Sequence, residues 1–472
     1  MKKVATALLL LAPGVAFGHA FGEPVQLPMP YGLYIWGSVL ALVLSFVLLA
    51  LGGNQSRLLN SHIPLRHPLV RTSTLQRLHR SAAAFWLAVL VLCVLTGFLG
   101  TRDSMRNINM TTFWIVFVLG GAYTAMLLGN WYARQFPWQV LMLPNWKGTH
   151  PYPRWLGHWP ATMLFVAMVS IELFLHNNPR QLAWMLLGYG VITCTGMTLF
   201  GTRRWLQRGD PLAALFRVFA ACAPLRRLPS QQGQVRWALV MPFSQLKRLR
   251  LWHPAQAVFV FFLLSSTAFD GLRETKVYFN VFWQDPLGLL TLAFGEHPMK
   301  IYPVVRPWFF AWEFGLLLAS PFFYLGLFWL FLRLGQSMTG KAHAMRLMMR
   351  RHLPSLIPIT VVYHVTHYYT LLLSQGLKIR GLVSDPLGWG WNLFGTAITG
   401  RLPWLPDMAN IWTSQVVLIL VGHVAAVWLS HAEALRMEGS TRKAALNQLP
   451  MLVLMVVFTA VGLWVLAQPL QG

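Results

Sequence analysis

The chain has 472 residues, of which 56% are hydrophobic and only 11% are charged, far below the charged share of soluble domains. This composition excludes a soluble domain as the main body of the protein. A net charge of +25 would suggest nucleic-acid binding in a soluble protein, but membrane proteins collect Lys and Arg in their cytoplasmic loops, so no nucleic-acid partner is predicted.

The amino terminus has the layout of a signal peptide. Two lysines precede an apolar run over 4–17 that is too short to span a bilayer. Small residues one and three positions before the cut predict cleavage between Gly18 and His19, and a cut two residues later is the alternative. We therefore expect a signal peptide at 1–18 and a single integral membrane domain at 19–472.

Cleavage at this position would make His19 the mature N-terminus. A terminal histidine offers both its α-amine and its imidazole to one metal ion, a chelate that suits copper. The alternative is an ordinary histidine that lies beside a cleavage site.

Ten apolar runs follow, most of them long enough to cross the hydrocarbon core as helices. They predict an all-α fold, a polytopic bundle of about ten transmembrane helices in a lipid bilayer. The expected spans are 33–52, 81–100, 112–132, 156–175, 182–200, 254–271, 308–332, 353–375, 411–433 and 448–468.

The distribution of Lys and Arg predicts the orientation in a bacterial inner membrane. With ten spans after a removed signal peptide, both mature termini lie in the periplasm. The loops then assigned to the cytoplasm carry 26 Lys and Arg residues, ten of them in the basic loop 201–252, against ten in the periplasmic loops. This is the bias expected of cytoplasmic loops.

Three other loop segments have a recognisable character. The apolar stretch 211–223 is typical of a helix lying on the inner leaflet. The periplasmic loops 272–307 and 376–410 are long, aromatic and rich in Gly and Pro, and loops of this kind often form the walls of a site.

Histidines at membrane depth are the first candidates for a functional site, because ionisable groups are costly there. His364 and His367 lie three residues apart and share one helix face, and His423 lies at a similar depth in the next span. These three predict one site for a divalent metal ion, zinc or copper, with His19 as a further ligand. For a single membrane histidine, a hydrogen bond to a neighbouring helix is the ordinary alternative.

Carboxylates near the expected periplasmic surface complete this site. Asp270 ends the sixth span and Glu313 begins the seventh, with Glu172 and Glu274 in the same outer half. We expect Asp270 or Glu313 to act as a general base. Asp270 has Arg273 as an alternative partner, whereas no local partner for Glu313 is evident.

Segments along nearly the whole chain resemble a family of bacterial membrane proteins that includes fenitrothion hydrolase subunits. They are HAFGEPVQLPMPYGLY, TGFLGTRDSMRNINMTTFW, FPWQVL, WPATMLFVAMVSIEL, GMTLFGTRRWLQRGDP, HPAQAVFVFFLLSSTAFDGL, YHVTHYYTLLLSQG, SDPLGWGWNLFGTA and GHVAAVWLSH. The chain departs from the family at Asn130 and Asn392, where an aspartate is expected, so the resemblance implies no catalytic role for either position.

The resemblance implies a membrane hydrolase of organophosphate triesters that works with a second membrane subunit. An apolar triester would partition into the bilayer and reach a site between helices. A metal ion could polarise the phosphoryl group and supply hydroxide, while a carboxylate accepts a proton.

Two other functions use the same residues. In a copper- or haem-binding redox protein the histidines would hold the metal. In a proton-coupled transporter the histidines and carboxylates would form a proton relay.

Overall fold

The computed structural model describes residues 31–51, 62–64, 70–143, 146–175, 178–228, 234–249, 251, 253–340, 343–397 and 406–467. The expected signal peptide at 1–18 and His19 lie outside these residues. Helices make up most of the described chain, and nine of them are long and apolar enough to cross a membrane. The predicted all-α polytopic bundle is therefore confirmed, and the protein is a multi-pass membrane protein.

The nine spanning helices correspond to nine of the ten expected spans. Their bounds are α2 Tyr31–Leu51, α4 Thr72–Leu99, α5 to α6 Ile108–Leu128, α8 Pro179–Phe200, α11 Pro254–Arg273, α14 Tyr302–Thr339, α15 Met345–Ser374, α17 Met408–Glu438 and α18 Thr441–Ala467. The third of these is α5 (Ile108–Met110), the π-helix η2 (Thr111–Gly120) and α6 (Gly121–Leu128) in series.

The run expected to be the fourth span forms a shorter helix, α7, at Trp159–Phe174. Its 16 residues rise about 24 Å at 1.5 Å per residue, which is less than the roughly 30 Å of hydrocarbon. Helix α7 packs against α10 (Pro211–Ala220) and α11, so it is part of the bundle.

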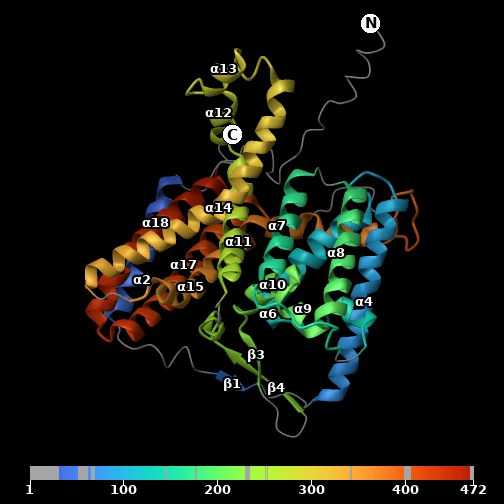
Figure 1. Cartoon of the computed structure of the whole chain (residues 1–472), viewed down its shortest axis with the longest axis horizontal. Coiled ribbons are helices and arrows are strands. Elements are labelled where there is room, and N and C mark those ends of the chain that lie inside the picture. The colour runs from blue at the N-terminus through green and yellow to red at the C-terminus, as the bar shows by residue number, and fades with distance from the viewer. Residues whose placement is uncertain are drawn as a thin grey trace.

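The helices form two groups joined through α11, α10 and α15 (Figure 1). In the first group α2, α14, α15, α17 and α18 pack together, and in the second α4 packs against α8 and the 3-10 helix η3 (Pro137–Leu141). Helix α11 contacts α7, α14 and α15, so it lies between the groups.

The two ends of the bundle differ. At one end, which we call the hairpin end, α12 (Lys276–Trp283), α13 (Leu289–Phe294) and the first turns of α14 extend beyond the other helices (Figure 1). At the opposite end, the sheet end, lies a small antiparallel sheet. The remaining short helices are α9 (Thr202–Arg208), η4 (Ser244–Arg248), η5 (Gly376–Lys378) and α16 (Ile379–Leu382).

The small sheet was not expected from the sequence. Strand β4 (Gln234–Val240) pairs with β1 (His62–Pro64), β2 (Val70–Arg71) and β3 (Leu225–Leu228), all antiparallel. The strands come from two loops far apart in the chain, and three of them have only two to four residues, which is too short for an alternating pattern to be seen.

Helix α10 differs from the expected interfacial helix. Its N-cap Asp210 accepts a hydrogen bond from the Ala213 amide at 2.6 Å, and Pro211 opens its first turn. Eight of its ten residues are buried inside the protein, because α6, α7 and α15 cover it. The prediction of a helix lying on the inner leaflet was therefore wrong.

Candidate functional site

Helix α11 positions Asp270 one turn before the helix ends at the hairpin end. The helix starts with a capping box, in which the His253 side chain accepts from the Ala255 amide and Gln256 accepts from the His253 amide. From this start, 20 residues of regular helix carry Asp270 to the last turn. The long apolar run keeps the helix within the bundle.

Helix α15 brings His367 against α11. A Cβ atom at Gly271 would meet the His367 ring at 3.3 Å and Val465 of α18 at 2.7 Å. A larger residue there would therefore crowd the Val465 side chain and the His367 ring. The absence of a side chain at Gly271 allows the imidazole to lie directly beside the last turn of α11.

Asp270, His367 and Tyr368 form a hydrogen-bonded cluster. His367 Nε2 lies 3.1 Å from Asp270 Oδ2, and the Tyr368 hydroxyl donates to the same oxygen at 2.8 Å. The side chains of His367 and Asp270 are 13% and 15% exposed, so both are largely removed from solvent. A carboxylate at hydrogen-bond distance fixes the imidazole tautomer, with the proton on Nε2 and a lone pair on Nδ1.

Further charges surround this cluster. Glu172 of α7 lies within electrostatic range of Asp270 and Arg273. Arg273 Nε is 3.8 Å from Glu313 Oε1, and Arg273 also donates to the Leu173 carbonyl at 3.0 Å. Glu313 thus has a partner that the sequence did not reveal, and it belongs to an ion pair beside the cluster.

Glu274 follows Arg273 at the end of α11, outside the spanning segment. Desolvation raises its pKa, and the Asp270 carboxylate raises it further, although Arg273 and His367 act in the opposite direction. Carboxylates from α7, α11 and α14 therefore gather at the hairpin end, as expected from the sequence.

His364 is buried on the same helix but turns towards other neighbours. Its ring packs edge-on against Phe219 of α10 at 5.2 Å and Tyr123 of α6 at 6.1 Å. It also lies 4.9 Å from the Tyr368 ring, which links it to the cluster. Its Nδ1 atom has no hydrogen-bond partner among the described residues.

His423 lies on α17, on the other side of α15. Its Nδ1 atom is 2.8 Å from the Ile419 carbonyl, and its Nε2 atom has no partner in the described part of the chain. The neighbouring Gly422 packs against Val362. Val362 and His364 are two residues apart on a helix and therefore point in roughly opposite directions.

The metal site predicted at His364, His367, His423 and His19 stays a prediction. The described residues contain no group of three His, Cys, Asp or Glu side chains arranged to hold a metal ion. His364 and His367 share a helix face, but His423 does not join them, and His19 lies outside the described residues.

The two positions that depart from the resembled family have local structural roles. Asn130 accepts a hydrogen bond from the Ala133 amide at 3.0 Å in the turn after α6. Asn392 accepts from the Ser384 hydroxyl at 3.1 Å and from the Ala397 amide at 3.0 Å. Both asparagine side chains therefore stabilise turns.

Sequence reasoning missed the direct role of Tyr368 and the pairing of Arg273 with Glu313. The signal that could have indicated Tyr368 is its place beside His367, at the depth of Asp270. The Arg273–Glu313 pair joins two helices that a 28-residue connection separates, so local spacing gave no sign of it.

Comparisons with known proteins do not assign a function to these residues. No family model matches the chain, and no curated protein or solved structure matches it significantly.

Proposed function

We propose that this protein is a membrane hydrolase of apolar organophosphate triesters in which His367, oriented by Asp270, accepts a proton from the attacking water. The observation that carries the proposal is the hydrogen bond between His367 and Asp270 in a nearly buried setting. The resemblance to the fenitrothion hydrolase family supports the substrate class, because two of the resembling segments contain Asp270 and His367.

The proposed reaction consumes one water molecule for each triester. Water oxygen forms a bond to phosphorus while the bond from phosphorus to the aryl oxygen breaks. His367 Nδ1 takes the water proton, and the aryl oxide leaves with the electron pair. Asp270 stabilises the resulting imidazolium without itself being protonated, and Tyr368 holds the Asp270 carboxylate in position.

The space beside the cluster is small. A cavity of about 10 Å³, which is roughly the space for one water, borders Glu172 between α7, α8 and η2. A triester is far larger than this cavity, so we infer that it enters from the lipid side as helices separate. A second membrane subunit is the partner that would hold such an opening.

The metal ion and the orientation are part of the proposal. A divalent ion, zinc or copper, stays a prediction from the sequence, and metal analysis of the purified protein tests for it directly. The charge bias supports an inner-membrane location, periplasmic mature termini and a site that opens to the periplasm.

Hydrolysis of a dialkyl nitrophenyl phosphate triester by the purified protein in nanodiscs is the test. Release of nitrophenolate is followed by absorbance. We expect Asp270→Asn and His367→Gln to lose activity, while the matched variants Glu296→Gln and His297→Gln, at the hairpin end away from the cluster, keep it. Wild-type protein that remains inactive together with its co-purified partner would refute the hydrolase.

A proton-coupled transporter is the second candidate. The gathering of Glu172, Glu274 and Asp270 beside His367 favours it, because such groups form proton relays in membrane transporters. Proton flux into proteoliposomes under a pH gradient distinguishes the two functions. Flux that Asp270→Asn abolishes, without any triester hydrolysis by the wild type, would favour the transporter.

A further inference from the structure

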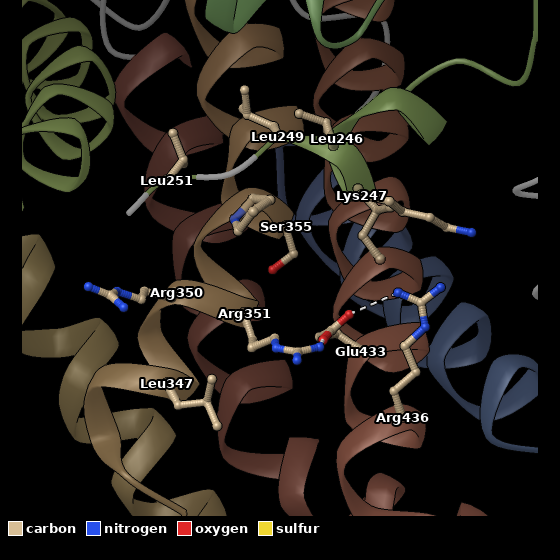
Figure 2. A pocket seen from close by; sticks show the side chains of 12 residues that line it. Leu246, Lys247, Leu249, Leu251, Leu347, Arg350, Arg351, Ser355, Glu433 and Arg436 are labelled. Carbon is tan, nitrogen blue, oxygen red and sulfur yellow. Dashed lines mark hydrogen bonds and ion pairs between the residues drawn. The ribbon is translucent and has the colours of Figure 1, made fainter. Parts of the chain in front are cut away.

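The sheet end holds a pocket that the proposed function does not use. It has a volume of about 390 Å³ and lies between the first turns of α15, the last turns of α17 and the η4 segment (Figure 2). The residues that line it are Leu246, Lys247, Leu249, Leu251, Leu347, Arg350, Arg351, Pro354, Ser355, Leu429, Glu433 and Arg436.

The charged groups of the pocket are predominantly basic. Lys247, Arg350, Arg351 and Arg436 contribute four positive charges and Glu433 one negative charge, which leaves a net charge of +3. In Figure 2 the guanidinium groups of Arg351 and Arg436 lie on either side of Glu433. Such a pocket attracts anions.

Glu433 holds two of these arginines in place. Its Oε1 atom accepts from Arg351 at 2.7 Å, and its Oε2 atom accepts from Arg436 at 3.2 Å. The arginine side chains remain 50% and 45% exposed, whereas that of Glu433 is only 14% exposed. Both guanidinium groups therefore keep N–H donors for a ligand. Because Glu433 already orders the two arginine side chains, ligand binding costs less side-chain entropy.

The rest of the wall is apolar. Five leucines and Pro354 line the pocket beside the charged groups. A small hydrophilic anion would leave this apolar surface unused, whereas an amphiphile with an anionic head would cover both parts. The same combination of basic and apolar side chains at the membrane surface recognises anionic phospholipids.

We propose that this pocket binds an anionic phospholipid, with the phosphate at Arg351, Arg436 and Lys247 and an acyl chain along the leucines. The pocket lies at the end opposite the Asp270 cluster, and the proposal does not depend on the hydrolase. The leaflet concerned is the one at the sheet end, where the sequence places the basic loops.

Lipid retention by the full-length protein tests the proposal. Protein is reconstituted in phosphatidylcholine nanodiscs with and without phosphatidylglycerol, and the bound lipid is measured by native mass spectrometry. We expect the double variant Lys247→Gln, Arg436→Gln to retain at least about tenfold less phosphatidylglycerol, since each charge-assisted contact is worth more than about 1.4 kcal/mol, a factor of ten.

The control is Arg442→Gln with Lys443→Gln, which removes two exposed charges at the same end, outside the pocket lining, and should retain lipid as the wild type does. Leu347→Trp fills the pocket without changing charge and should also expel the lipid. Equal retention by the wild type and both pocket variants overturns the proposal. Displacement of the lipid by inorganic phosphate alone would identify a soluble anion as the ligand and also overturn it.

Discussion

Replacing Asp270 by Asn is the most informative single change at the candidate site. Asn has nearly the same shape and still offers an oxygen to the Tyr368 hydroxyl, which lies 2.8 Å from the carboxylate. It removes the negative charge 3.1 Å from His367 Nε2. The imidazole then loses the partner that fixes its tautomer and stabilises its protonated form.

The expected loss of activity follows from these two effects. A positioned general base contributes about 10² to 10⁴ in rate, and the equivalent Asp to Asn change in a serine-protease triad costs about 10⁴. We expect kcat to fall by about 10³, which corresponds to about 4 kcal/mol of transition-state stabilisation. Tyr368→Phe, which removes one donor and leaves the charge, should cost about tenfold or less.

The assay compares the pH dependence of triester hydrolysis in these variants. Asp270→Asn should lower the rate at every pH with its insertion and thermal midpoint largely retained. If it keeps kcat within about threefold of the wild type, Asp270 does not orient a base and the mechanism is refuted.

Three further predictions concern the fold. A Cβ at Gly97 would meet the Pro179 carbonyl at 2.6 Å, so Gly97→Ala should lower the thermal midpoint, whereas Gly188→Ala, with nothing within 4 Å, should not. Burial lowers the pKa of His158 from 6.5 to about 4, with nearby arginines and His253 adding to the effect, so the folded state prefers neutral imidazole. Stability should therefore fall as pH drops from 6.5 towards 4 and level off below it, and His158→Gln should flatten this fall in a thermal-shift series. A periplasm-dependent reporter fused after Gly472 should be active, and a cytoplasm-dependent one should be inactive.

The sequence predicted the helices well because spanning helices have a simple signal. Each needs about twenty apolar residues, and nine such runs form helices that overlap the expected spans. The fourth run was harder to interpret, since the apolar stretch 156–175 includes the turn before Trp159. The burial of α10 could not be predicted either, because the composition of a buried apolar helix resembles that of an interfacial one.

The candidate site was only partly predictable. Depth along each span correctly placed Asp270 near His367, because both lie in the last turns of their helices. The depth of a residue along a helix does not say which way its side chain points around the helix axis. His364 and His423 lie at similar depths but point towards different neighbours. The partner of Glu313 could not be predicted for a similar reason. Arg273 lies on another helix and meets Glu313 only because α11 and α14 pack together.

Some of the other buried polar groups in the described bundle have only neutral partners. Asn109 donates to the backbone carbonyls of Cys93 and Pro179, and His431 pairs with Gln448, a neutral partner. Such contacts satisfy polar groups and hold helices together, and they need no charge. The Asp270–His367 pair instead places two ionisable groups in contact where charge is costly. Because a neutral amide would satisfy the same donors at lower cost, the carboxylate indicates a role that requires charge, as proton transfer does.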